Sequence, residues 1–280
     1  MITPQSISEK LMYSTVRLEI GAITATGFFY KVNSSKKSII VISNRHFAEQ
    51  VDSLDKLNWN LTTIKQKTSF ALHLDDGQNY NICDDIDWHL HPSEDLAFFD
   101  LTSILLKQLL PTNVRFSILH ISSQEIPTQQ QLDDLSAIEN IVMVGYPNGL
   151  YDAKNNYPIF RTGKTASHPA VDYNGKKEAL IDVSCIPGSS GSPVFILDEG
   201  WVKCKNGSLS QGDRVYFIGI ENSMPTRFSN SLYEKTITST GQAQLVKLTN
   251  YFIEDDIKLG YYIKSSALQG FNAQILALGL

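Results

Sequence analysis

The sequence predicts an all-β protein, built as a sandwich or as barrels. Short runs of β-branched and aromatic residues recur along the chain and turn-forming residues separate them. The clearest helical patterns are short, at 7–12 and 104–109. Many short strands punctuated by turns are typical of these two architectures. With 280 residues, the chain can bury one large core or two smaller ones.

The first half of the chain contains four predicted strands. They lie at 13–20, 25–32, 38–43 and 70–74. The stretch 33–37, with the sequence Asn-Ser-Ser-Lys-Lys, is predicted to be a hairpin loop, and Asp75-Asp76-Gly77 to be a further turn. Asn, Asp, Ser and Gly favour turns because they tolerate backbone conformations that bulkier residues resist.

A polar stretch without clear periodicity divides the chain at 119–140. It contains three consecutive glutamines, 129–131, and the acidic pair Asp133-Asp134. We interpret it as a linker between an N-terminal domain, 1–118, and a C-terminal domain, 141–280. Predicted strands resume after it at 141–145, 179–183, 193–197, 215–220 and 261–264, and a short helix follows the last one.

Composition and charge exclude several functional classes. Hydrophobic residues make up 42% and charged residues 19%, which is ordinary for a folded domain. A formal net charge of -5 disfavours binding to nucleic-acid backbones, which requires a positive field. The first ten residues lack a secretory core, and no stretch is apolar for long enough to cross a bilayer. We therefore predict a cytoplasmic protein with no nucleic-acid and no membrane partner.

The cysteines indicate neither a disulfide framework nor a metal site. There are three, Cys83, Cys185 and Cys204, an odd number at wide spacings, and the histidines also lack ligand spacing. This pattern fits a reducing compartment. We expect no metal and no cofactor, and we expect Cys185 to line a pocket wall rather than to act as a nucleophile.

The sharpest local motif surrounds Ser190, in the run Pro-Gly-Ser-Ser-Gly-Ser-Pro at 187–193. Glycines on both sides of a serine allow a tight turn that exposes its hydroxyl. Such a turn can also aim the backbone N–H groups of Gly188 and Ser190 at one point, as an oxyanion hole requires. The competing interpretation is a Gly/Ser-rich loop between two strands.

A serine hydroxyl needs an adjacent base to act as a nucleophile, and His46 is the best candidate. The apolar run 39–42 leads directly into the polar segment that carries His46, so the imidazole is expected at the end of a strand. The other five histidines lack this setting.

Asp95 is the best candidate to orient that base. It stands just before the apolar run 96–99, where a buried acid needs a hydrogen-bonded partner such as an imidazole N–H. A simple surface acid is the alternative interpretation, and Glu94 is the competing carboxylate.

Four motifs together resemble the successive motifs of trypsin-like serine peptidases. They are Thr26-Gly27-Phe28-Phe29, Ser43-Asn44-Arg45-His46, Glu94-Asp95-Leu96-Ala97 and Gly188-Ser189-Ser190-Gly191-Ser192-Pro193. The order His, Asp, Ser and the wide spacings match that family, and the resemblance spans residues from about 14 to 265. It implies two six-stranded antiparallel barrels with the active site in the cleft between them. His46 and Asp95 would come from the first barrel and Ser190 from the second.

The resemblance also implies a polypeptide substrate and the residues that bind it. The segment 218–224 would line the groove and offer its backbone to a bound peptide, which makes Ile220, Glu221 and Asn222 candidate binding residues. Ser184 corresponds to the base of the specificity pocket. A serine there carries no charge, so we expect a preference for neutral or apolar side chains.

The position just before the nucleophile suggests how activity is controlled. Relatives activated by proteolysis place an aspartate there, which pairs with a newly formed N-terminus, whereas this chain has Ser189. We therefore expect no activation by that route, and control, if any, by a partner protein or by loop ordering. The segments around 145–152 and 155–163 resemble a bacterial intracellular branch of the family, which suggests a part in antiviral defence.

Two alternatives come from other classes. A protease-derived module that binds or senses peptides without cleaving them would carry a broken triad, whereas all three members are present here. An α/β-hydrolase would place its histidine after the serine, and no histidine follows Ser190.

Overall fold

The computed structural model describes residues 3–31, 38–51, 56–109, 115–223, 226–229, 232–237, 243–248, 253–256 and 258–280. The hairpin loop predicted at 33–37 lies outside these residues.

The first barrel is closed by six antiparallel strands. The ladder runs β1-β4-β5-β6-β3-β2 and returns from β2 to β1, while the short β7 (Ile121–Ser122) adds in parallel to β2. The six strands are β1 (Thr15–Ile20), β2 (Ile23–Lys31), β3 (Ile39–Ser43), β4 (Thr63–His73), β5 (Asn79–Leu90) and β6 (Ala97–Asp100).

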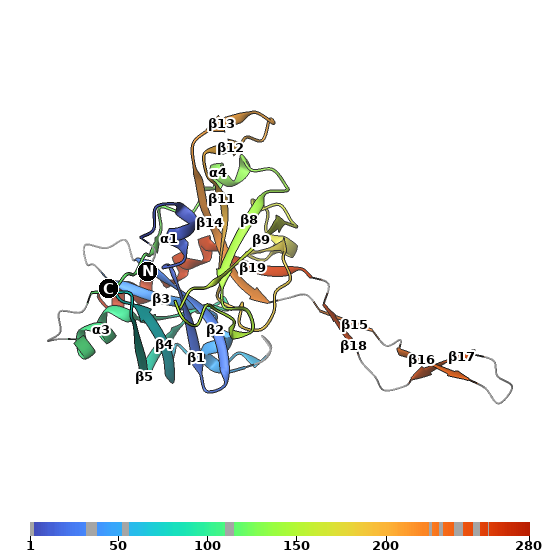
Figure 1. Cartoon of the computed structure of the whole chain (residues 1–280), viewed down its shortest axis with the longest axis horizontal. Coiled ribbons are helices and arrows are strands. Elements are labelled where there is room, and N and C mark those ends of the chain that lie inside the picture. Colours follow the sequence, from blue (N-terminus) through green and yellow to red (C-terminus); the bar gives the residue numbers. More distant parts are fainter. Residues whose placement is uncertain are drawn as a thin grey trace.

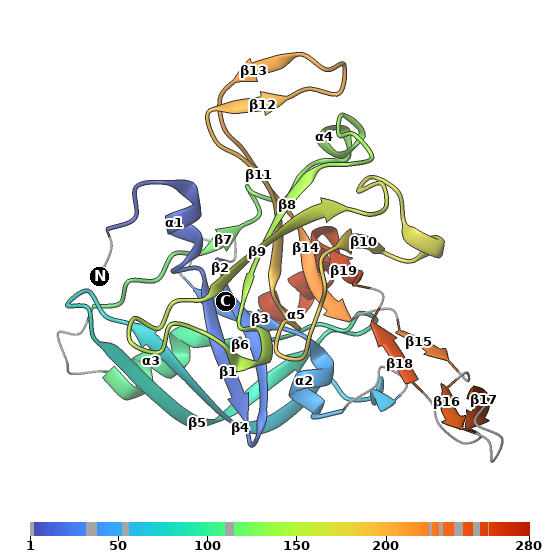
Figure 2. The ribbon, with the colours of Figure 1, turned by 45° about the vertical axis from the view of Figure 1, so that its right-hand side comes forward.

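The second barrel is closed in the order β10-β19-β14-β11-β8-β9. Its strands are β8 (Asn140–Gly145), β9 (Ile159–Thr165), β10 (Glu178–Asp182), β11 (Pro193–Asp198), β14 (Arg214–Ser223) and β19 (Gly260–Lys264). The expected pair of six-stranded antiparallel barrels is therefore confirmed. Figure 2 shows the first barrel, in blue to teal, below the second, in green to orange.

Three two-stranded ladders lie outside the barrels. They are β12 (Trp201–Lys203) with β13 (Leu209–Gln211), β15 (Thr226–Ser229) with β18 (Ile253–Asp256), and β16 (Leu232–Ile237) with β17 (Ala243–Leu248). In Figure 1 the last two ladders extend away from both barrels.

The helices are short. They are α1 (Ile7–Leu11), α2 (Arg45–Glu49), α3 (Leu101–Leu109), α4 (Gln129–Asp133) and α5 (Asn272–Ala277), with 3-10 turns η2 (Pro147–Gly149), η3 (Tyr173–Gly175) and η4 (Ser265–Phe271). The segment predicted as a linker, 119–140, carries β7 and α4. Across the described residues, none of the helices combines the length and the apolar character that a membrane span requires.

Strand β5 shows why sequence patterns missed part of the first barrel. Its buried positions carry Ile82, Ile86, Trp88 and Leu90, while most of the intervening positions face outward and several of these are acidic. Asp and Asn are rare in strands, so the acidic outer face conceals the alternation.

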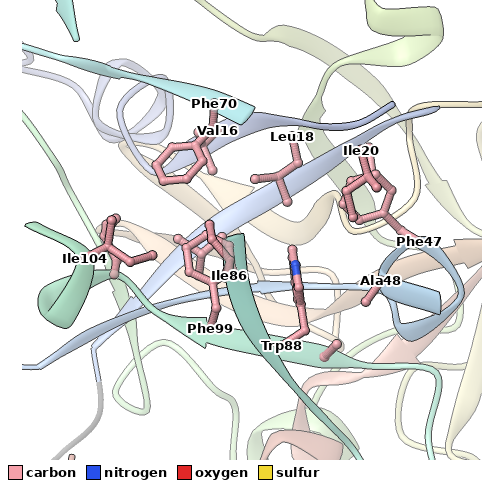
Figure 3. Close-up of a cluster of buried hydrophobic side chains, with 14 of the residues drawn as sticks. Val16, Leu18, Ile20, Phe47, Ala48, Phe70, Ile86, Trp88, Phe99 and Ile104 are labelled. Carbon is pink, nitrogen blue, oxygen red and sulfur yellow. The ribbon is translucent and has the colours of Figure 1, made fainter. Parts of the chain in front are cut away.

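Each barrel has its own apolar core, and a third cluster joins the two barrels. Figure 3 shows the first core, where Phe47 of α2 packs edge-on against Trp88 of β5. The joining cluster contains Phe28 of the first barrel and Phe217 of the second, whose ring centroids are 5.3 Å apart. Residues of η4 and α5 complete that cluster, so the C-terminal segment packs where the barrels meet.

Candidate active site

His46 lies in the first turn of α2, directly after strand β3. The sequence predicted a polar turn here, and the chain instead forms a five-residue helix. Asn44 occupies the N-cap position, but its side chain makes no capping bond. Its amide donates instead to the backbone carbonyl of Asp95 at 2.9 Å, which ties the start of the helix to the neighbouring loop.

Asp95 holds His46 through two hydrogen bonds. Its Oδ1 accepts from the backbone N–H of His46 at 2.7 Å, and its Oδ2 accepts from Nδ1 of the imidazole at 2.6 Å. Because an ionised carboxylate only accepts, Nδ1 carries the proton and Nε2 is the basic nitrogen. The structure therefore brings together two predicted residues 49 positions apart in the chain.

Two opposing influences set the basicity of the imidazole. Burial lowers the pKa of His46, but the charge of Asp95, its hydrogen bond and the charge of Glu221 raise it by more. The net pKa of His46 is therefore above the usual value for histidine. An imidazole with a raised pKa is a stronger base once it is neutral.

Ser190 lies in a tight turn after the segment that leaves β10. Gly188 and Gly191 adopt φ of +86° and +88°, conformations that favour glycine. The Ser190 side chain is half-buried. In the part of the chain that the structure describes, its hydroxyl makes no hydrogen bond to His46, a bond that is often long in free enzymes and shortens with substrate.

The first barrel reaches this turn directly. A methyl group on Gly191 would lie 2.0 Å from the carbonyl oxygen of Thr26 in β2 and 2.6 Å from Oγ of Ser43 at the end of β3. Ser43 is three residues before His46, so the turn that carries Ser190 packs against the strand end that carries the imidazole.

The backbone of the turn leaves two N–H groups unused. The carbonyl of Pro187 accepts from the N–H of Asn148 at 2.6 Å, so the N–H of Gly188, on the other side of the same trans peptide, points away from Asn148. Across the described residues, neither this N–H nor that of Ser190 donates to another backbone group. Both donors are free to meet a developing negative charge.

Comparison with known protein families matches the sequence to one of them. The profile of the trypsin-like peptidase domain matches residues 25–203, which is more than half of the chain. The chain belongs to the trypsin-like peptidases.

Other comparisons are distant. No curated protein sequence matches this trypsin-like peptidase. Among solved structures, Deg5 is similar at 16% identity and a TM-score of 0.46, over 77% of this chain and 81% of that one. A Glu endopeptidase is similar at 10% identity and a TM-score of 0.42, over 94% of this chain and 90% of that one. A scabies mite inactivated protease paralogue is similar at 11% identity and a TM-score of 0.46, over 96% of each chain.

Of the predicted substrate-binding residues, Ile220 lies away from any open edge. Its side chain is fully buried in the cluster between the barrels. Its backbone pairs with Pro193 of β11 on one side and with Ile263 of β19 on the other. A central strand has no free edge, so a peptide cannot pair with this peptidase at Ile220.

Glu221 lies beside the turn 187–192 that carries the candidate nucleophile Ser190, the nucleophile turn. Its carbonyl accepts from the N–H of Gly191 at 3.0 Å, and its own N–H donates to the backbone carbonyl of Ser192 at 2.9 Å. Burial raises the pKa of its carboxyl to about 7, against the lowering effects of the Cys185 thiol, His46 and Arg161. The charge of Glu221 acts on the imidazole, where it contributes to the raised pKa of His46.

The remaining predicted residues lie close to Glu221 in the chain or in the fold. Asn222 is buried, and among the described residues neither its Oδ1 nor Oε2 of Glu221 has a hydrogen-bond partner. Ser184 is half-buried. Met224, the last residue of the predicted groove segment, lies outside the described residues.

Sequence reasoning assigned no role to Thr26 and Asn148, which both hold the nucleophile turn. Thr26 opens the first of the four family motifs, and Asn148 follows a Gly-Tyr-Pro run, but neither pattern by itself indicates a partner. No group of three histidine, cysteine or acidic residues in the described part of the chain could hold a metal ion.

Proposed function

We propose that the protein is a serine endopeptidase that cleaves peptide bonds through an acyl-enzyme on Ser190. His46 is the general base, Asp95 orients it, and the N–H groups of Gly188 and Ser190 form the oxyanion hole. The observation that carries the proposal is the pair of hydrogen bonds from His46 to Asp95, because they leave Nε2 as the basic nitrogen of a ring next to the nucleophile turn.

Acylation follows from these positions. Oγ of Ser190 attacks the carbonyl carbon of the scissile bond while its proton passes to Nε2 of His46. The negative charge moves to the carbonyl oxygen, where the two unused N–H groups stabilise it. The imidazolium then protonates the leaving amine as the C–N bond breaks.

Deacylation repeats the sequence with water in place of the amine. Water gives a proton to His46 and attacks the acyl carbon, and the returning proton regenerates the hydroxyl of Ser190 as the acid leaves. Asp95 accepts from Nδ1 throughout and stabilises the imidazolium without becoming protonated.

Labelling with a fluorophosphonate probe tests the proposal, because the probe reacts only with an activated serine. Wild type should be labelled, Ser190→Ala should not, and His46→Ala should react at least about 10²-fold more slowly. Ser208→Ala, in the turn between β12 and β13, is the matched control and should label fully. A folded wild type that never labels, with or without candidate partner proteins, would favour the non-catalytic peptide-binding or sensor module.

The family resemblance extends the proposal beyond the reaction itself. It adds a polypeptide substrate bound near Ser184, Glu221 and Asn222 and a part in antiviral defence. Ser189 supports control by an activating partner, and the cysteine pattern supports a cytoplasmic location. Partner control predicts that the labelling rate rises when the partner is added, and an unchanged rate would contradict it.

A further inference from the structure

The polar groups of Thr26, in strand β2, form hydrogen bonds with the nucleophile turn and with residues that pack against it. The residue is fully buried. Its hydroxyl donates to the carbonyl of Gly188 at 2.9 Å, and its backbone N–H donates to the carbonyl of Ser190 at 2.9 Å. Its own carbonyl accepts from Ser43 Oγ at 2.8 Å, so these hydrogen bonds also reach the end of strand β3, which leads to His46.

The same hydroxyl also accepts two hydrogen bonds. One comes from the N–H of Tyr146 at 3.0 Å and the other from Oγ of Ser192 at 3.2 Å. One donated and two accepted bonds use the full capacity of a hydroxyl group. Thr26 Oγ1 therefore joins three points of the second half of the chain. They are Tyr146 after β8, Gly188 before Ser190 and Ser192 after it.

These bonds immobilise four successive peptide planes. The carbonyls of residues 187, 188, 189 and 190 accept, in order, from Asn148 N–H, Thr26 Oγ1, Ser192 N–H and Thr26 N–H. Fixing the first and third carbonyls directs the N–H groups of Gly188 and Ser190 to the opposite side of their trans peptides. Thr26 fixes the second and fourth planes, and through Tyr146 it supports the turn that presents Asn148.

The position just before the nucleophile offers no comparable support. Ser189 is buried, and its hydroxyl has no hydrogen-bond partner in the part of the chain that the structure describes. A serine cannot form the ion pair that an aspartate at this position would form. The first barrel instead supplies two of the bonds that hold the turn, both from Thr26.

We propose that Thr26 is the positioning residue that keeps the oxyanion-hole turn formed in the uncleaved chain. The inference rests on the proposed function of Ser190 and adds how its site is preorganised. Because these two bonds cross from one barrel to the other, the hole forms when the two barrels pack, without a proteolytic step.

Three substitutions separate positioning from general stability. Thr26→Val keeps the shape and removes the hydroxyl, while Thr26→Ser keeps the hydroxyl. Thr165→Val is the matched control: Thr165 is buried in the second barrel, where its hydroxyl donates to Ala137 at 2.7 Å and accepts from Glu139 at 2.9 Å. If Thr26→Val does not fold, Thr26→Ala replaces it, because it adds no methyl group against Ser192.

We expect Thr26→Val to slow fluorophosphonate labelling by about 10²-fold, the scale of losing one oxyanion donor. With p-nitrophenyl acetate as substrate, kcat should fall with little change in KM, because the hole acts on charge that develops in the transition state. Thr26→Ser should restore both, and Thr165→Val should leave both near wild type.

Hydrogen exchange of the peptide covering 186–192 gives a readout that needs no activity. Thr26→Val should speed exchange there, and Thr165→Val should not. Equal exchange and equal labelling in the two valine variants would overturn the inference. A wild type that never labels would overturn the proposed function, whereas the exchange result would still decide the role of Thr26.

Discussion

At the scale of single residues, two carboxyl groups raise the pKa of His46 in different ways. Asp95 accepts two hydrogen bonds from His46 and orients the ring. Glu221 has no hydrogen-bond partner for Oε2 within the described ranges and acts on His46 through its charge. Burial raises the pKa of Glu221 to about 7, so its charge changes near neutral pH.

Glu221→Gln should shift the pH dependence of activity. Removing a charge that raises the pKa of His46 leaves the imidazole neutral at lower pH, so the acid limb of kcat/KM should move to lower pH. Glu94→Gln is the control, because Glu94 is not among the charges acting on His46. A pH–rate profile for the ester substrate measures both. An acid limb that stays in place would show that Glu221 does not influence the base.

The same substitution should change how stability depends on pH. Between the unfolded pKa of 4.5 and the folded value of about 7, the native state keeps a proton that the unfolded chain releases. Glu221 therefore destabilises the fold progressively as pH rises through this window, by about 3 kcal/mol in all, and not below it. Urea unfolding at pH 4.5 and pH 8 should show this loss in wild type and not in Glu221→Gln.

At the scale of elements, helix α2 has its own anchor next to the catalytic ring. Arg45 is fully buried and pairs with Glu49 at 2.6 Å, one turn along the helix. It also donates to the carbonyl of His91 at 2.6 Å and stacks over Trp59 at 4.7 Å. The guanidinium thus ties α2 to the loop before β4 and to the end of β5. These contacts fix the start of the helix and with it the position of His46.

Arg45→Leu should destabilise the protein strongly. It leaves the buried Glu49 without its cation, and breaking a buried pair typically costs about 3–5 kcal/mol. Lys65→Ala breaks an exposed pair with Asp87, separated by 3.5 Å, and should cost at most about 1 kcal/mol. Urea unfolding compares the two, and equal effects would mean that the buried cluster adds nothing.

At the scale of the whole molecule, the barrels share an apolar cluster. It contains Phe28 and Phe98 of the first barrel, Phe217 of the second and Phe271 of the C-terminal segment. Phe98 and Phe271 meet edge-on at 4.9 Å. The division into 1–118 and 141–280 remains a prediction about chain organisation, but the cluster leads us to expect that the two barrels unfold together.

Phe28→Ala tests this expectation. Truncating a buried phenylalanine typically costs about 3–5 kcal/mol. If the barrels form one cooperative unit, calorimetry should show a single transition at lower temperature, and exchange should speed up in β14 as well as in β2. Trp201→Ala, at a side chain that is 59% exposed, should change neither. Two separate transitions would show that the barrels unfold independently.

Sequence patterns predicted the candidate site residues and most of the strands that hold them. The apolar run before His46, the acid at the entry to β6 and the glycines around Ser190 are local signals, because each depends on residue type and spacing alone. Strand β5 went unnoticed because acidic residues on its outer face conceal the alternation, and β9 because only its last residue, Thr165, is buried.

The tertiary structure decided which groups meet. Packing placed Ile220 in the cluster between the barrels, let the charge of Glu221 act on the imidazole and surrounded Thr26 with four hydrogen-bond partners in addition to Ser43. The sequence alone determined the candidate reactive residues and their order, because side-chain chemistry and strand periodicity are local properties. Hydrogen-bond partners across two barrels depend on how the closed sheets pack, and local patterns do not record that arrangement.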